Sequence, residues 1–126
     1  MTQRAVTDTE AAIAERARNV LPAGGVGNVT FDIVIREGRG GRAWDESGNE
    51  YLDFLLGSGP MLVGHAHPDV TAAVQEQVSK GSTFFVNNEA GIQLAEAIVD
   101  AMACAEKVRF LSSGSEATFY AMRVAR

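Results

Sequence analysis

The stretch Lys107-Val-Arg-Phe-Leu-Ser-Ser-Gly-Ser-Glu-Ala117 is the most informative part of this 126-residue sequence. Its first five residues predict a short β-strand, because they are mainly apolar and are followed by a glycine-containing loop. The residues from Glu116 onward predict a helix, since apolar side chains recur there at helical spacing. Other helices are predicted before this stretch, and the order helix, strand, helix is typical of a layered α/β domain.

The loop before the last predicted helix has the composition of an anion-binding site. Unpaired amides and the positive end of the helix dipole attract anions at a helix N-terminus. Ser113 and Ser115 add hydroxyl donors, and Gly114 lets an oxygen atom approach the backbone closely. The sequence therefore indicates a phosphate site at Ser113, Gly114 and Ser115. The pattern from Ser113 to Glu116 also fits a capping box that binds nothing, and both interpretations stay open at this point.

The first half of the chain predicts one helix and a small antiparallel sheet. Thr7 is placed to cap a helix that Pro22 ends. Strands are predicted at Phe31–Arg36, Arg42–Asp45 and Glu50–Phe54, and a polar turn joins the last two into a hairpin.

The second half predicts two further helices before the Lys107 stretch. Pro68 suits the start of one helix and Gly81 suits its end, and the pair Asn87-Asn88 is placed to cap the next. We expect residues 1–66 to form the N-terminal helix and small sheet, and residues 67–126 to begin a larger α/β domain. We expect this larger domain to be truncated, because the last helix has no terminating Gly, Asn or Pro.

Histidine and cysteine give weak signals. His65 and His67 are two positions apart, but no third histidine exists, so a metal site would need carboxylates. We expect no metal site, with Gly64 forming a turn and His67 capping the following helix. Cys104 is expected to be a packed thiol. Three aromatic side chains are expected to pack on one face of the small sheet: Trp44, Tyr51 and Phe54.

The composition excludes several classes of protein. Hydrophobic residues make up 46% and charged residues 21%, as in ordinary globular proteins, and no apolar run is long enough for a membrane span. The formal net charge of -5 argues against nucleic-acid binding, and a single cysteine suits a reducing, cytoplasmic environment. Glycine, with 13 residues, is enriched and clustered in loops. We therefore expect neither a nucleic-acid nor a membrane partner.

Several stretches together resemble the class III aminotransferases, which are fold type I pyridoxal phosphate enzymes. The resemblance is greatest to the glutamate-1-semialdehyde 2,1-aminomutase branch, and order and spacing agree from about Leu21 to the end of the chain. The matching stretches are Gly38–Phe54, Gly59–Pro68, Ala73–Gln77, Lys107–Ala117 and Ala121–Arg126.

The resemblance implies a fold, a cofactor and a reaction. The chain would form the N-terminal part of an α/β fold type I transferase that binds pyridoxal 5'-phosphate. Gly114 and Ser115 would hold the cofactor phosphate, and the loop with Ser58 and Gly59 would line the substrate side. The enzyme would be a homodimer that moves an amino group, through a Schiff base, between a small-molecule amino donor and a carbonyl acceptor.

The resemblance also implies that a catalytic residue lies elsewhere. Family members use a lysine for the Schiff base, and neither Lys80 nor Lys107 has the family's lysine setting. We therefore expect an N-terminal fragment without the catalytic lysine. Aminomutases carry an aromatic residue where this chain has Ser58, and they supply an arginine from a region where this chain has none. Aminomutase and transaminase activities both stay open, as do a small non-catalytic α/β module that binds a phosphorylated ligand and an inactive truncated product.

Overall fold

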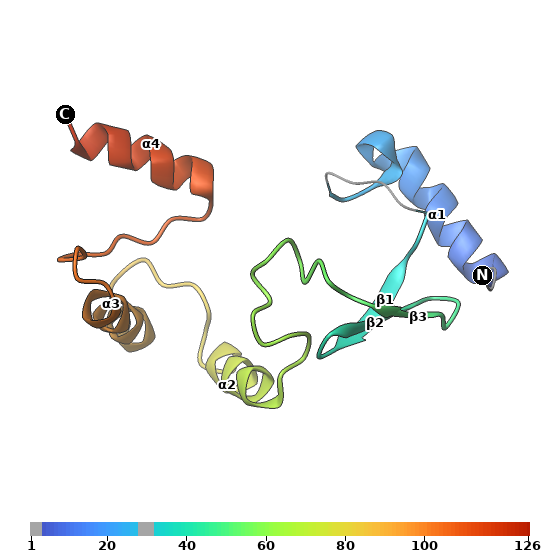
Figure 1. The fold of residues 1–126 in the computed structure, drawn as a ribbon, viewed down its shortest axis with the longest axis horizontal. Helices are drawn as coiled ribbons and strands as arrows, with labels where there is room; N and C mark the ends of the chain where they lie inside the picture. Colours follow the sequence, from blue (N-terminus) through green and yellow to red (C-terminus); the bar gives the residue numbers. More distant parts are fainter. Residues whose placement is uncertain (1–3, 28–31) are drawn as a thin grey trace. The chain divides into compact units, whose positions relative to one another are not determined.

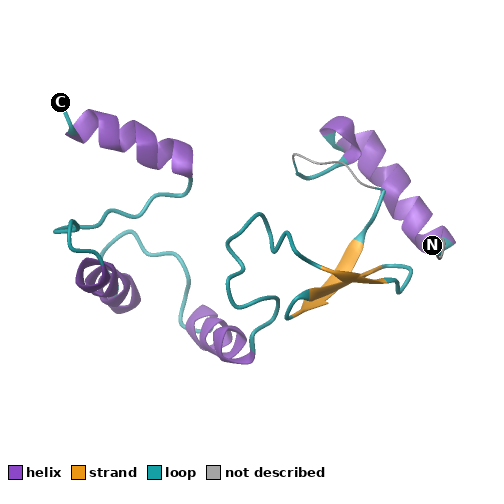
Figure 2. Cartoon of the chain, in the orientation of Figure 1, coloured by secondary structure: helices purple, strands orange, loops and turns teal. Residues whose placement is uncertain are grey.

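The computed structural model describes residues 4–27 and 32–126, and these form helices together with a small sheet (Figures 1 and 2). The elements in chain order are α1 (Asp8–Val20), η1 (Pro22–Gly24), β1 (Ile35–Arg39), β2 (Arg42–Asp45), β3 (Glu50–Leu52), α2 (Pro68–Val78), α3 (Glu89–Ala101) and α4 (Gly114–Val124). The α/β class expected from the sequence is confirmed. The chain divides into two compact units, Met1–Lys80 and Gly81–Arg126. The expected domain boundary after residue 66 stays a prediction.

Three helices begin where the sequence predicts, and α4 begins at Gly114, two residues before the predicted start at Glu116. Thr7 caps α1 by accepting a hydrogen bond from the Glu10 amide, and Asn88 caps α3 in the same way from the Gly91 amide. Pro68 occupies the first turn of α2, where its missing N–H leaves no partner unsatisfied. None of the helices in the described residues is long and apolar enough to cross a membrane.

The small sheet has the order β1-β2-β3, and both pairs of strands are antiparallel. The hairpin of β2 and β3 is confirmed, although its second strand ends at Leu52 instead of Phe54. The predicted strand Phe31–Arg36 is displaced along the chain, because β1 extends to Arg39 and pairs with β2 across the turn at Gly40. Phe31 lies outside the described residues.

The strand predicted at Lys107–Leu111 is absent from the structure. A strand needs a neighbouring strand to receive its backbone hydrogen bonds, and in the described residues the only strands are those of the small sheet. Two side-chain predictions are also wrong. Phe54 is 91% exposed, since it lies beyond the end of β3, and Cys104 is exposed in the turn after α3. Trp44 and Tyr51 are half-buried.

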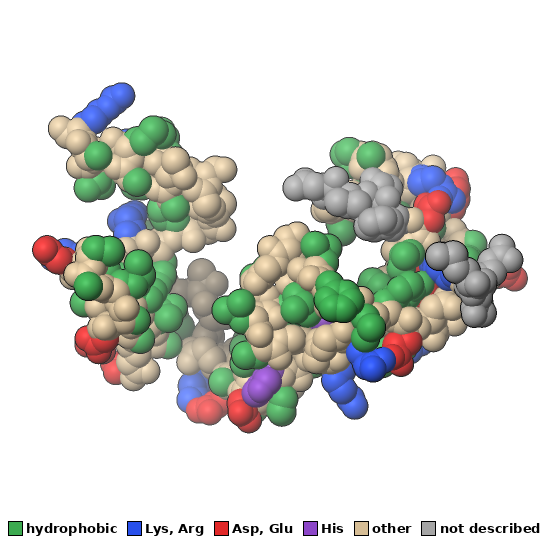
Figure 3. Space-filling model, in the orientation of Figure 1, with side chains coloured by type: hydrophobic (Ala, Val, Ile, Leu, Met, Phe, Trp, Pro, Cys, Tyr) green, Lys and Arg blue, Asp and Glu red, His purple; other side chains and the backbone are tan. Residues whose placement is uncertain are grey.

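The described residues contain almost no apolar core. Ala43 is the one buried hydrophobic residue among them, and α2, α3 and α4 contact no other helix or strand of their own unit. Large apolar side chains therefore lie at the surface of both units (Figure 3). Burial of apolar area is the usual source of folding energy, so other interactions must hold the first unit together.

Glu10 is one of two buried acidic residues that take this role. Its carboxylate accepts hydrogen bonds from the Val34 amide, at 2.9 Å, and from the Ser47 hydroxyl, and it forms an ion pair with Arg4. The Glu10 carboxylate therefore does not bond to the amide of Thr7, the residue that caps its helix. The amide of Thr7 instead donates to Ser47 Oγ at 2.8 Å, so the start of α1 is attached to the hairpin turn.

Asp45, at the end of β2, is the second buried acidic residue. Its carboxylate accepts hydrogen bonds from the Tyr51 hydroxyl at 2.6 Å, from the side chain and amide of Asn49 at 2.8 Å each, and from Arg4 at 3.2 Å. Burial opposes the charged form, but these hydrogen bonds outweigh it and hold the pKa of Asp45 well below its usual range. Polar contacts therefore join α1 to the hairpin.

Replacing Glu10 by alanine tests this arrangement. The change removes the acceptor of the Val34 amide and leaves Arg4 without its Glu10 partner, so we expect the free energy of unfolding to fall by about 1–3 kcal/mol. The measurement is urea unfolding followed by the fluorescence of Trp44, the sole tryptophan. Glu15→Ala is the control, because Glu15 is an exposed partner of Arg18 on the same helix and should matter by less than about 1 kcal/mol. Equal effects of the two changes would contradict the role assigned to Glu10.

Candidate functional site

The predicted phosphate site lies at the N-terminus of α4. Ser113 has extended backbone and caps the helix, with its Oγ accepting from the Glu116 amide at 3.2 Å. The Glu116 carboxylate accepts from the Ser112 amide at 2.9 Å. Among the described residues, the amides of Gly114 and Ser115 have no hydrogen-bond partner. The cap and an open pair of helix amides therefore coexist, and one does not exclude the other.

Gly114 has no structural reason to be glycine within the described chain. Its backbone is helical, with no positive φ, and an added Cβ would have no heavy atom within 4 Å. Alanine is favoured over glycine inside a helix by roughly 0.5–1 kcal/mol. The side of the helix that a Cβ would occupy is open, so an oxygen atom is free to approach the two unpaired amides there.

Glu116 is the one acidic residue in the first turn of α4. A carboxylate in this position would repel a bound anion if it faced the free amides. Its bond to the Ser112 amide, on the N-terminal side of the cap, fixes it in another interaction. The printed bond of this carboxylate is therefore to the residue before the cap, and not to the amides of Gly114 and Ser115.

Cation–π contacts support the loop before α4. The guanidinium of Arg109 lies 5.0 Å from the ring centroid of Tyr120, and that of Arg123 lies 5.9 Å from the same ring. Arg109 precedes the loop and Tyr120 follows it. The contact between Arg109 and Tyr120 therefore connects the two sides of the loop and restrains the backbone amides of the loop.

The predicted substrate-side residues lie in a loop with unusual backbone. Four consecutive residues have positive φ: Leu56 at 46°, Gly57 at 67°, Ser58 at 66° and Gly59 at 106°. Glycine adopts such angles freely, but the left-handed conformation costs other residues about 1–2 kcal/mol each. Leu56 and Ser58 are therefore strained. Ser58 and Gly59 are also exposed, so burial of its side chain does not offset the strain at Ser58.

Asp53 holds the base of this loop. Its Oδ1 accepts hydrogen bonds from the amides of Leu55 and Leu56, at 2.9 Å each, and its Oδ2 lies 2.6 Å from Nε2 of His65. The hydrogen bond with His65 is the main cause that lowers the pKa of Asp53, and the Leu56 amide adds to it. Sequence reasoning missed this pair, because the two residues are twelve positions apart and no periodic pattern connects them.

His65 is itself fixed through its backbone. Its amide donates to the carbonyl of Gly40 at 2.9 Å, and its carbonyl accepts from the Gly40 amide at 2.8 Å. Two glycines make this approach possible. A Cβ on Gly38 would lie 2.6 Å from His65 Cγ, and a Cβ on Gly64, whose φ is 78°, would lie 2.8 Å from the carbonyl carbon of Gly40.

His67 precedes α2 as its cap residue, but the expected side-chain cap is not formed. The side chain of His67 makes no cap hydrogen bond, and its Nδ1 is buried with no hydrogen-bond partner among the described residues. The turn expected at Gly64 is present. Within the described chain, no group of three or more His, Cys, Asp or Glu side chains could hold a metal ion.

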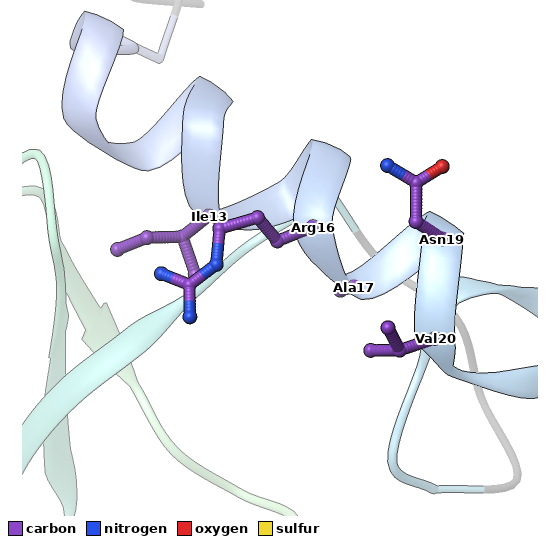
Figure 4. Close-up of a pocket in the computed structure, with 5 residues that line it drawn as sticks. All are labelled: Ile13, Arg16, Ala17, Asn19 and Val20. Carbon is purple, nitrogen blue, oxygen red and sulfur yellow. The ribbon is translucent and has the colours of Figure 1, made fainter.

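The two lysines have no catalytic setting in the structure. Lys80 is exposed after α2, with its Nζ 2.6 Å from the Glu76 carboxylate, and Lys107 is exposed in the segment before α4. A hollow on one side of α1 also offers little chemistry (Figure 4). Its lining residues all come from that helix: Ile13, Arg16, Ala17, Asn19 and Val20.

Comparison with known proteins gives one family. The family model described as aminotransferase class-III matches residues 23–126, which include both loops described above. The glutamate-1-semialdehyde 2,1-aminomutase of Methanothermobacter thermautotrophicus is 46% identical over 115 residues, covering 88% of this chain and 27% of that protein. The enzyme of the same name from Syntrophomonas wolfei is 40% identical over 129 residues, covering 95% and 30%.

Solved structures agree with the sequence relatives. An omega-transaminase from Sphaerobacter thermophilus matches with a TM-score of 0.84 and 36% identity, over 93% of this chain and 28% of that one. A transaminase with PLP bound matches with a TM-score of 0.86 and 35% identity, over 98% and 30%. The chain thus spans less than a third of the length of each of these proteins.

Replacing Gly64 by alanine tests the junction that positions the loop. The new Cβ would overlap the backbone of Gly40 and would require a positive φ, so we expect unfolding to become easier by about 2 kcal/mol or more. The measurement is urea unfolding, again through Trp44. Gly41→Ala is the matched control, because an added Cβ there has no atom within 4 Å and no positive φ is required. A Gly64→Ala protein as stable as the control would show that the junction is not constrained.

Proposed function

Because the chain belongs to the class III aminotransferase family, we propose that it supplies the phosphate anchor and part of the substrate side of a pyridoxal phosphate-dependent enzyme. This enzyme moves an amino group between an amine or amino acid and a carbonyl compound, as an aminotransferase or aminomutase. The segment corresponds to the N-terminal part of a fold type I transferase. Residues 1–66 belong to its small domain, and residues 67–126 begin its large one.

The two unpaired amides at Gly114 and Ser115 are the observation that carries this proposal. They offer two N–H donors at the positive end of α4, and the hydroxyl of Ser115 is a third donor. The Ser113 oxygen accepts a bond from Glu116, which leaves its own O–H free to donate to a phosphate oxygen. The residues present therefore fit a phosphate group. When bound, pyridoxal phosphate supplies the electron sink that amino-group transfer requires.

Ser58 and Gly59 form the substrate side in this proposal. The strained backbone of Ser58 supports the assignment, because strained residues are concentrated at functional sites, and both residues are exposed. The side chain of Ser58 is small and polar, so it leaves space beside the loop and offers a hydroxyl to a substrate. The proposal includes both aminomutase and transaminase activity, since the relatives named above include enzymes of both kinds.

The lysine that this chemistry needs lies outside these 126 residues in the proposed enzyme. Lys80 is paired with Glu76, and Lys107 is exposed before the loop. The enzyme is further proposed to be a cytoplasmic homodimer. The exposed side chains of Phe84, Phe85 and Val86 support an interface with another part of the assembly, and the single cysteine suits a reducing compartment.

Titration of the chain with three probes tests the phosphate anchor. Pyridoxal phosphate and inorganic phosphate should shift the amide resonances of Gly114 and Ser115, whereas pyridoxal without phosphate should not. Gly114→Ala should weaken phosphate binding roughly ten- to hundredfold, because its Cβ occupies the open approach and the loss matches one charge-assisted hydrogen bond.

Gly27→Ala is the control for this titration, since an added Cβ at Gly27 also meets no atom within 4 Å. It should bind phosphate as the unchanged chain does. Equal shifts with pyridoxal and pyridoxal phosphate, or equal affinity of the Gly114→Ala and Gly27→Ala chains, would contradict the anchor.

The assignment of the lysine predicts that the 126-residue chain alone shows no amino-group transfer. Transamination needs a lysine placed to exchange the proton of the substrate, and neither lysine of the chain has that setting. The measurement is a coupled assay for the keto product, with several amino donors and added pyridoxal phosphate. Detectable turnover that Lys80→Met or Lys107→Met abolishes would place the catalytic lysine within the chain, against this prediction.

A further inference from the structure

Asp53 and His65 lie between the rigid hairpin and the strained loop, and neither has a role in the proposed function so far. His65 is attached to the hairpin by the two backbone bonds to Gly40. Asp53 follows β3 and is attached to the same hairpin, since its amide donates to the Gly41 carbonyl at 2.9 Å. Both residues therefore start from fixed backbone positions before their side chains meet.

The side chain of Asp53 connects the hairpin to the loop. One carboxylate oxygen accepts from His65 Nε2, at 2.6 Å, while the other accepts from the amides of Leu55 and Leu56. Both side chains are mostly shielded, with 19% and 26% exposed surface for Asp53 and His65. A shielded carboxylate with three donors is held in one orientation, because losing any donor leaves part of its charge unsolvated.

Leu56 is the first residue of the strained run that includes Ser58. Its amide is bonded to Asp53, and its carbonyl accepts from the amides of Gly59, at 3.3 Å, and Met61, at 3.2 Å. The peptide groups on both sides of Leu56 are thus restrained, and Ser58 lies inside the turn that these bonds close. The bonds to Asp53 therefore offset the unfavourable φ of Leu56 and set the place of Ser58.

We propose that Asp53 and His65 are positioning residues that hold Ser58 on the substrate side of the site. His65 orients the Asp53 carboxylate, Asp53 fixes the amides of Leu55 and Leu56, and these fix the turn that presents Ser58. The inference rests on the proposed function in one respect, which is that Ser58 faces the substrate. It assigns no contact with the substrate to Asp53 or His65 themselves.

Two alanine variants and two conservative variants test whether Asp53 and His65 hold the loop. Asp53→Ala removes the acceptor, and we expect hydrogen exchange at the amides of Leu55 and Leu56 to accelerate roughly tenfold, as for the loss of one hydrogen bond. His65→Ala should accelerate it less, because the Asp53 carboxylate is still present. Asp53→Asn keeps an oxygen toward the amides, and His65→Gln keeps a nitrogen near the place of Nε2, so both should restore slow exchange.

His67→Ala is the matched control for His65→Ala, because His67 lies two residues away and its Nδ1 has no hydrogen-bond partner among the described residues. It should leave exchange at Leu55 and Leu56 unchanged. Unchanged exchange in Asp53→Ala would overturn the positioning pair, whatever the function of the loop. Complete unfolding of both alanine variants and both conservative variants would also overturn the positioning pair, because the conservative variants keep the hydrogen-bonding atoms.

Kinetics of the enzyme that carries this segment test the functional half. We expect His65→Ala to raise the KM for the amino substrate about tenfold with a smaller change in kcat, since Ser58 is displaced while the phosphate anchor is intact. A purely structural defect would instead lower kcat by reducing the folded fraction and leave KM unchanged. Faster exchange at Leu56 with an unchanged KM would overturn the substrate role of Ser58, yet it would leave the phosphate anchor at Gly114 and Ser115 standing.

Discussion

The two backbone hydrogen bonds between Gly40 and His65 are the constraint on which the first unit depends. They bring the chain after β3 back onto the turn between β1 and β2. This return is possible only because Gly38 and Gly64 carry no side chain at the crossing. Once His65 is held there, its imidazole meets Asp53, and the loop from Leu56 to Gly59 is closed between two anchored points.

The same unit is assembled by polar groups where most domains use apolar ones. Glu10 and Asp45 are the fully buried side chains of the described chain, and both are saturated with hydrogen bonds. Such contacts are specific in direction and partner, so they set the position of α1 on the hairpin more narrowly than apolar packing would. The exposed apolar faces of α2, α3 and α4 are left for other contacts, in a chain that spans less than a third of its relatives.

Local features were predictable from the sequence, and features that need a distant partner were not. The caps at Thr7, Asn88 and Ser113 follow from short-range bonds within one turn, so residue type and spacing suffice to find them. The strand expected at Lys107–Leu111 depends on a neighbouring strand that the described residues do not provide. The Asp53–His65 pair could not be predicted for a related reason, because only the fold brings the two side chains together. A cluster of glycines at the crossing was the one signal available, and glycine alone does not say what it approaches.

Gly64 and Gly114 are glycines for different reasons. Gly64 is required by atoms of its own chain, because any side chain would overlap Gly40. Gly114 is the first residue of α4, and a Cβ added there would meet no heavy atom within 4 Å. No contact within the described residues requires its lack of a side chain. A phosphate oxygen at the free amides of Gly114 and Ser115 would use it, since those donors and that open space lie at the same end of one helix. A phosphate bound there would account both for the glycine at this position and for the unpaired amides beside it.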